Sequence, residues 1–136
     1  MLKFISVNFE FIGGILVAIL DIKKAGDLVL KQQAQPIERI DKTIRTLLDD
    51  MTETMYKANG VGLAAPQVGQ SIQVVVIDVG EGLLELINPT IIRKEGTEID
   101  TEGCLSVPEI YGEVERAAKV SVEYLNRRGK RHRITA

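Results

Sequence analysis

Histidine and cysteine are the scarcest reactive residues of this sequence, with one of each among 136 residues. One cysteine cannot close a disulfide within the chain, which excludes a disulfide-built scaffold and fits a reducing compartment. One histidine cannot supply the two imidazoles, one helical turn apart, on which many three-ligand metal sites rely. A large excess of charge is lacking too, because the formal net charge is -2. We therefore expect no binding of nucleic acid, and residues 127–131, which are rich in arginine, are interpreted as a solvated hairpin tip.

Long hydrophobic runs are also absent. The longest apolar stretch, residues 12–20, is bounded by Glu10 and Asp21 and has about half the length that crosses a bilayer. A secretory signal would need a basic start and a clear cleavage site, but Lys3 is followed by Asn8 and Glu10. We expect neither a membrane span nor export, and therefore a cytoplasmic protein.

One amphipathic helix is predicted over residues 41–58. Its apolar residues recur at three- and four-residue spacings: Ile44, Leu47, Leu48, Met51 and Met55. Asp41 is suited to the N-cap, and Asn59 and Gly60 can both adopt the left-handed conformation that ends helices. The methionines are interpreted as core residues rather than ligands.

Strands are predicted after the helix. They are expected at residues 72–79, 83–88, 91–95, 98–101, 119–125 and 130–135. Pro89 is expected to end the second of them, and residues 126–129 form the last turn. The order of one helix followed by many strands predicts a single α+β domain, with antiparallel β-sheets packed around helix 41–58.

The first unusual motif is Gly60-Val61-Gly62-Leu63-Ala64-Ala65-Pro66-Gln67. Its glycine spacing superficially matches a dinucleotide-binding loop, but such a loop follows a strand and opens a helix, which is the reverse order. A second interpretation is that the glycines merely turn the chain from helix to strand. That interpretation leaves Gln67, beside two small alanines, unexplained.

The second motif is Glu102-Gly103-Cys104-Leu105-Ser106. Cys104 admits three interpretations: a small buried apolar residue, a thiolate metal ligand, or a nucleophile. A nucleophile would need a base, and His132 is the one candidate. We expect His132 to be exposed, because it lies between Arg131 and Arg133 in a basic strand.

Both motifs, in this order within residues 17–136, resemble those of peptide deformylase. That family removes the formyl group from the N-terminal methionine of new bacterial proteins by metal-dependent hydrolysis. The resemblance implies that the Gln67 amide and the Leu105 backbone N–H bind the developing oxyanion. It implies a substrate-binding set of Gly60, Val61, Gly62, Glu102 and Gly103, with Glu102 also supporting the site from behind. It further implies that Cys104 is a ligand of Fe(II) or Zn(II).

The family's third motif, His-Glu-x-Asp-His on a C-terminal helix, is not among the 136 residues. The resemblance therefore predicts a C-terminally truncated domain at 17–136 that binds no metal and is inactive. The alternative is a catalytically dead relative that acts as a peptide-binding or structural protein. Residues 1–16 are interpreted as an upstream-translated extension, because Val17 stands where relatives begin.

Loss of that helix would uncover an apolar groove near Leu63, Val76 and Leu105. Large apolar grooves are rarely left open to water. The apolar residues 9–16 could fold into the groove, or two chains could pair across it. We expect pairing, and hence a homodimer, because Gly13 and Gly14 disfavour a substitute helix.

Overall fold

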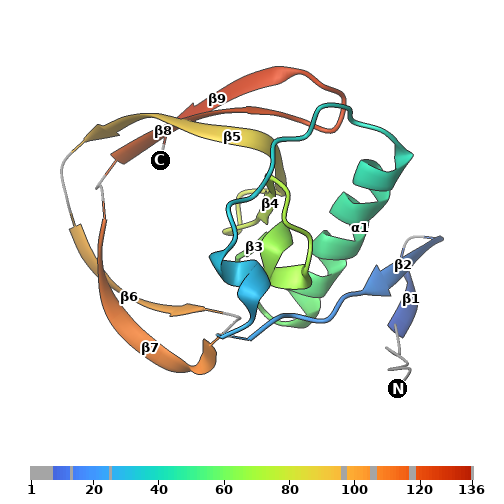
Figure 1. Cartoon of the computed structure of the whole chain (residues 1–136), viewed down its shortest axis with the longest axis horizontal. Coiled ribbons are helices and arrows are strands. Elements are labelled where there is room, and N and C mark those ends of the chain that lie inside the picture. The colour runs from blue at the N-terminus through green and yellow to red at the C-terminus, as the bar shows by residue number, and fades with distance from the viewer. Residues whose placement is uncertain are drawn as a thin grey trace.

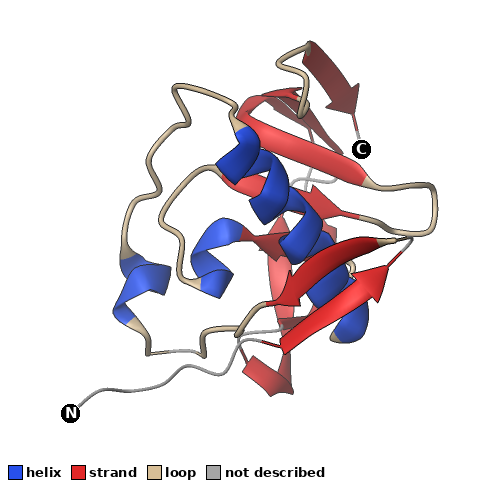
Figure 2. Cartoon of the chain, turned by 90° about the vertical axis from the view of Figure 1, so that its right-hand side faces the viewer, coloured by secondary structure: helices blue, strands red, loops and turns tan. Residues whose placement is uncertain are grey.

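The computed structural model describes residues 8–12, 14–24, 26–95, 98–104, 107–116 and 119–135, with residues 8, 15, 98–104 and 107–116 described by their backbone alone. One helix and several antiparallel strands surround a single core (Figures 1 and 2). The predicted α+β class, with antiparallel sheets and a helix, is confirmed. The described ranges contain no helix with the length and apolar character needed to cross a membrane.

Helix α1 spans Lys42–Lys57 and agrees with the predicted helix. The Asp41 side chain caps it by accepting a hydrogen bond from the Ile44 N–H at 3.1 Å. Its buried face carries residues at helical spacing: Ile44, Leu48, Met51, Thr52, Thr54 and Met55. The predicted core role of the methionines is confirmed, since Met51 and Met55 have no exposed surface.

A five-stranded antiparallel sheet covers this face of α1, in the order β3-β4-β5-β8-β9. Its strands are β3 (Gly62–Ala64), β4 (Val74–Ile77), β5 (Leu84–Glu95), β8 (Lys119–Leu125) and β9 (Arg131–Thr135). Alternate residues of β3 and β4 point into the core, so Leu63, Val74 and Val76 are buried with Ile87 of β5. Leu63 and Val76 therefore do not line an open groove, contrary to expectation, because these side chains pack with those of α1. Leu105, its third expected residue, lies outside the described residues.

Strand β5 corrects the expectation that Pro89 ends a strand. The strand continues through Pro89 to Glu95, but its pairing with β8 shifts register between Ile87 and Thr90. Asn88 lies within this shift at φ 52°, and its side chain accepts from the Ile37 N–H at 2.7 Å and donates to the Ile37 carbonyl at 2.8 Å. A bulge thus accommodates the proline, which lacks the N–H that regular pairing requires.

The turn between β8 and β9 is fastened to the core by Arg127. Its guanidinium contacts both carboxylate oxygens of Glu85, at 2.8 and 2.5 Å, and reaches Asp49 of α1 at 2.7 Å. The hydrogen bonds with Glu85, followed by that with Asp49, raise the pKa of Arg127 above its ordinary value. The interpretation of residues 127–131 as a wholly solvated tip is therefore wrong for Arg127.

The N-terminal residues form a hairpin of β1 (Asn8–Ile12) and β2 (Ile15–Ile19). This hairpin packs on α1 of the same chain, where Val17 and Ala18 are buried. The Ala18 N–H donates to Asp50 at 2.9 Å, and the Leu20 N–H donates to the Thr54 hydroxyl at 2.8 Å. The apolar N-terminal segment is therefore held on α1 by hydrogen bonds from its backbone N–H groups to side chains of the helix.

A second hairpin is formed by β6 (Glu98–Cys104) and β7 (Val107–Arg116). It is a two-stranded sheet of its own and lies across the molecule from α1 (Figure 1). Two short 3-10 helices, η1 (Leu28–Lys31) and η2 (Ala65–Val68), complete the described elements. The two sequence motifs thus belong to different structural units, the first next to α1 and the second on β6.

Candidate functional site

The end of helix α1 determines where the glycine-rich segment, residues 60–67, begins. The Gly60 N–H donates to the Met55 carbonyl at 2.9 Å, and the Asn59 N–H donates to the Tyr56 carbonyl at 3.0 Å. This is the Schellman pattern of helix termination, with Asn59 left-handed at φ 56°. The predicted stop signal is therefore confirmed, and the asparagine rather than Gly60 takes the left-handed position.

Asp78, at the end of β4, holds the middle of this segment. Its backbone N–H donates to the Val61 carbonyl at 2.9 Å. Its carboxylate accepts from the Tyr56 hydroxyl at 2.6 Å and from the Gly80 N–H at 2.8 Å. Val61 is thus fixed between the last turn of α1 and the end of β4, with its own side chain 62% exposed.

The same contacts perturb two titrating groups. Donation to Asp78 raises the pKa of Tyr56 to about 12, because losing the proton would break the hydrogen bond beside a negative charge. The hydrogen bond from Tyr56, followed by that from Gly80, lowers the pKa of Asp78. Tyr56 is therefore a proton-bearing donor at neutral pH and not a candidate base.

Strand β3 and helix η2 position the other end of the segment. Leu63 and Ala65 are buried, with 1% and 0% exposure, and anchor the backbone on either side of Ala64. The Gln67 Oε1 accepts from the Ala64 N–H at 3.0 Å, and the Gln67 carbonyl accepts from the Lys23 N–H at 2.6 Å. Both the backbone and the side-chain amide of Gln67 are therefore held in place.

Glu102, Gly103 and Cys104 lie at the C-terminal end of β6, where their backbone pairs with β7. Pairing shifts register between Gly103 and Cys104, so that Cys104 is opposite Val107. Leu105 lies outside the described residues. The roles expected of these four residues stay predictions.

His132 is on β9, and its expected exposure is confirmed. Its Nε2 lies 3.1 Å from the Asn126 side-chain nitrogen, and its ring stacks on Tyr124 with centroids 5.7 Å apart. Among the side chains that the structure describes, no three of His, Cys, Asp and Glu are grouped to hold a metal. The one imidazole of the chain is thus occupied in a surface stack.

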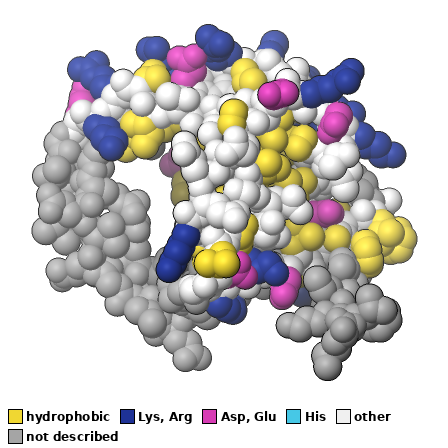
Figure 3. Space-filling view, in the orientation of Figure 1, with side chains coloured by type: hydrophobic (Ala, Val, Ile, Leu, Met, Phe, Trp, Pro, Cys, Tyr) yellow, Lys and Arg dark blue, Asp and Glu magenta, His cyan; other side chains and the backbone are white. Residues whose placement is uncertain are grey.

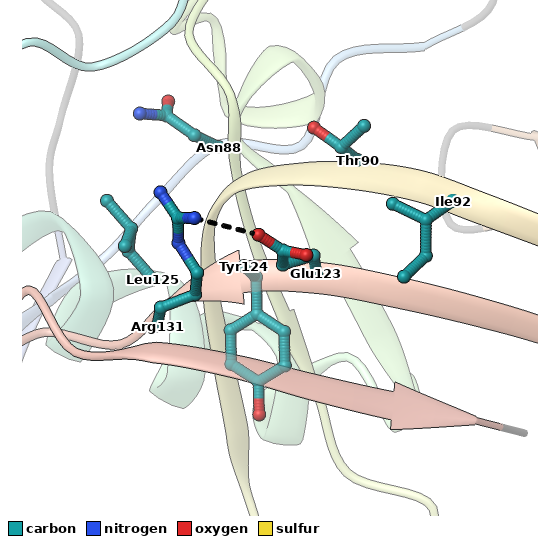
Figure 4. Close-up of a pocket in the computed structure, with 7 residues that line it drawn as sticks. All are labelled: Asn88, Thr90, Ile92, Glu123, Tyr124, Leu125 and Arg131. Atoms are coloured by element: carbon teal, nitrogen blue, oxygen red, sulfur yellow. Dashed lines mark ion pairs between the residues drawn. The ribbon is translucent and has the colours of Figure 1, made fainter.

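A cleft of about 300 Å³ lies next to β5, β8 and β9, away from the glycine-rich segment (Figure 4). Asn88, Glu123 and Arg131 already have partners, since Asn88 binds both backbone groups of Ile37, and Glu123 pairs with Arg131 at 3.3 Å. Figure 4 shows the Tyr124 ring pointing away from Asn88 and Thr90. The carboxamide and the carboxylate of this cleft are therefore already engaged in structural contacts.

Sequence reasoning did not single out Tyr56 and Asp78. The available signal was an acidic residue directly after the apolar run Val74–Ile77, together with a tyrosine in the last turn of an amphipathic helix. Neither residue is diagnostic alone, because the two come together only when β4 pairs beside β3.

Known proteins match this chain in sequence and in structure. The profile of the family described as "Polypeptide deformylase" matches residues 19–136. The peptide deformylase of Desulfitobacterium hafniense is 62% identical over 113 residues, which are 83% of this chain and 75% of that protein. That of Acetivibrio thermocellus is 59% identical over 114 residues, which are 84% of this chain and 67% of that protein.

Solved structures agree with these sequence matches. The crystal structure of peptide deformylase from Thermotoga maritima aligns with a TM-score of 0.84 at 43% identity, over 86% of this chain and 80% of that one. The enzyme from Legionella pneumophila aligns with a TM-score of 0.85 at 44% identity, over 88% and 72%. Sheet, helix and glycine-rich segment therefore define an α+β protein of the deformylase class. The chain belongs to the polypeptide deformylase family.

Proposed function

We propose that this chain carries the peptide-binding half of a peptide deformylase site, for an enzyme that hydrolyses the N-formyl group from the N-terminal methionine of nascent bacterial proteins. Gly60, Val61 and Gly62 would receive the peptide backbone. Family membership supports the reaction, and the conformation of Gly62 supports the location.

Gly62 is the observation that carries this proposal. Its backbone does not adopt the left-handed region, and an added Cβ would meet only the Val76 carbonyl at 3.8 Å and Ile77 Cγ1 at 3.9 Å. Both are ordinary contact distances, so the fold itself does not require a glycine here. A glycine that the fold does not need is explained by close approach of another backbone, as peptide binding would demand.

Gln67 is proposed to stabilise the oxyanion that forms when the formyl carbon is attacked. The hydrogen bond from the Ala64 N–H to its Oε1 orients the amide group, which limits reorganisation during the reaction. The Leu105 N–H is proposed as the second donor. Glu102 and Gly103 are proposed to border the same substrate.

The 136 residues do not fit the family's Fe(II) or Zn(II) by themselves. A catalytic site of this kind needs three protein ligands, and Cys104 is the one thiol available. His132, the one imidazole, is engaged with Asn126 and Tyr124 on β9. We propose that a polypeptide of these 136 residues holds no stoichiometric metal and does not turn over formyl-Met peptides.

This part of the proposal is tested by elemental analysis and by turnover. One iron or zinc per chain, together with hydrolysis of formyl-Met-Ala-Ser, would overturn it. The alternative function, a catalytically dead relative that binds peptides or acts structurally, shares the expected absence of turnover. A peptide-binding measurement distinguishes the two forms of this alternative, because a purely structural protein would not bind formyl-Met peptides.

The proposed domain comprises residues 17–136, with residues 1–16 as an extension, and its proposed location is the cytoplasm.

We also propose that the chain forms a homodimer, through its N-terminal hairpin rather than across a groove. In the β1–β2 hairpin, Phe9, Phe11 and Leu16 are 60%, 76% and 54% exposed, and they lie on one face of the paired strands. Sedimentation of the chain and of a Phe11→Ser variant tests this, because a monomer in both cases would contradict pairing through the hairpin.

The peptide-binding proposal is tested by titrating formyl-Met-Ala-Ser into the chain and into Gly62→Ala. We expect the added methyl to weaken binding about tenfold, through overpacking against the peptide, while the melting temperature stays unchanged. Gln70→Ala, an exposed change beyond η2, is the matched control and should bind normally. Equal binding by Gly62→Ala and the parent chain would refute the proposed location.

A further inference from the structure

A second cleft, of about 630 Å³, lies where the segment before α1 meets the β8–β9 turn. Its volume falls within the usual range for small-molecule sites. It is at the N-terminal end of α1, whereas the glycine-rich segment is at the C-terminal end. Sixteen helical residues separate the two ends by about 24 Å. The cleft is therefore remote from the proposed deformylase site.

Arginines dominate the rim of this cleft. Arg127 is already neutralised by Glu85 and Asp49, but Arg39, Arg45 and Arg128 form no ion pair in the part of the chain that the structure describes. The carboxylate that lines the same cleft is that of Glu38. Figure 3 shows Lys and Arg side chains along the upper and right-hand margin of the molecule, with Asp and Glu side chains among them.

The floor of the cleft is apolar. Ile37, Ile40 and Leu125 line it and are half-buried, each packed against the main core. Arg45 is held beside this floor, because its Nη1 donates to the Ile40 carbonyl at 3.4 Å. A ligand that fills the cleft would thus meet apolar surface below and guanidinium groups above.

We propose that this cleft binds a small organic anion, in which an apolar body carries a carboxylate or phosphate group. Guanidinium groups match the planar, two-oxygen geometry of these anions and are easily desolvated. The apolar floor favours a ligand with a hydrophobic body over a bare ion. A long polyanion is disfavoured by the formal net charge of -2 on the whole chain.

The test uses the whole chain and the intrinsic fluorescence of 1-naphthyl phosphate and 1-naphthoate, which separates phosphate from carboxylate ligands. We expect at least one of them to bind saturably, and Arg45→Gln and Arg128→Gln each to weaken that binding about fivefold to tenfold. Arg93→Gln removes the same charge from the outer part of β5 and is the matched control. Circular dichroism melting should show the same stability for all four proteins.

Four outcomes would overturn the proposal. Equal weakening by Arg93→Gln would mean that general surface charge attracts the probes. If inorganic phosphate bound as tightly as the naphthyl anions, the apolar floor would not contribute to binding. If neutral 1-naphthalenemethanol bound as tightly, the arginines would not contribute. Binding of a short oligonucleotide at this cleft far more tightly than either anion would indicate a polyanion site. None of these results bears on peptide binding at Gly62, so the two proposals fail independently.

Discussion

The two halves of the candidate site are built in different ways. The glycine-rich half, residues 60–67, is fixed by the end of α1, by Asp78, and by the buried side chains of Leu63 and Ala65. The cysteine half, residues 102–104, ends a strand that pairs with β7 in a sheet of its own. The core therefore preorganises the half that is proposed to bind peptide, while the proposed metal ligand is carried by a separate hairpin. Changes in the core should disturb the first half and leave the second hairpin paired.

The largest expected effect comes from Leu63→Ala. Leu63 is 1% exposed, so its truncation leaves a cavity in the core and should cost about 2–5 kcal/mol of unfolding free energy. Urea denaturation measures this cost. Val61→Ala, two residues away but 62% exposed, should change stability by no more than about 0.5 kcal/mol. A similar loss of unfolding free energy in both variants would contradict the claim that buried side chains fix the glycine-rich half.

A thiol placed in each half should report the contrast directly. We expect Cys104 to react readily with an alkylating reagent under native conditions, because the proposed lack of a bound metal would leave its thiolate without a ligand and β6 belongs to a small hairpin. In a Cys104→Ser background, Ala65→Cys introduces a thiol at a position with 0% exposure. It should react at least about tenfold more slowly, since modification requires local opening. For each thiol, the alkylation rate of the native protein is divided by the rate in denaturant, and the two ratios are compared. Equal ratios for Cys104 and Ala65→Cys would contradict the contrast between the two halves.

Tyr56→Phe should loosen the glycine-rich half without unfolding the chain. It removes the donor to Asp78, so the pKa of Asp78 should rise towards its ordinary value, and the Asp78 amide should exchange hydrogen faster. Because the folded-state pKa of Asp78 is lowered, its stabilising effect is present above the ordinary pKa of 3.8 and disappears as pH falls through the folded value. Carboxyl titration by NMR measures the shift. An unchanged titration would show that the Tyr56 contact is dispensable.

The smallest expected effect is that of Asp50→Asn, outside both halves. Burial raises the pKa of Asp50, more than the hydrogen bond from Ala18 lowers it. A raised folded-state pKa means that the contribution of Asp50 to stability is greatest below its ordinary pKa of 3.8 and falls as pH rises through the folded value. The asparagine keeps an acceptor for Ala18 without the charge, so we expect equal or slightly higher stability at pH 7 and a flatter dependence of stability on pH above 3.8. A clear loss of stability at pH 7 would contradict this account.

The parts of the fold with strong periodicity could be predicted from the sequence. Helix α1 and strand β8 were predicted to within a residue at each end, because the first has a clear apolar stripe and the second alternates. Strand β5 was divided at Pro89, since a bulge stabilised by Asn88 and Ile37 depends on residues 51 positions apart. The burial of Leu63 and Val76 was not predicted, for a similar reason. Which face of β3 and β4 meets α1 is decided by packing, and the pattern alone does not reveal it.

The sequence indicates which residue types belong to the candidate site. It does not reveal the contacts that hold those residues in place. The resemblance of the two motifs to those of peptide deformylase points to Gly62, Gln67 and Cys104, whereas the residues taken alone leave structural interpretations open. The contact between Tyr56 and Asp78 is invisible in the sequence, since it depends on how the end of α1 meets β4. The same holds for Arg127, whose partners Asp49 and Glu85 come from two other elements.

Strand β9 forms an edge of the five-stranded sheet as described, and its outward residues bear on self-association. An edge strand offers unpaired backbone groups to any second strand, which makes it a template for aggregation. Arg131 and Arg133 are both exposed on this edge strand, and they share one partner, Glu123, at 3.3 and 3.8 Å. Their two positive charges exceed its single negative charge, so a second copy would still have to bring like charges together. Salt screens such repulsion. The colloidal behaviour of the chain should therefore depend on ionic strength through two side chains that contribute nothing to the proposed peptide site.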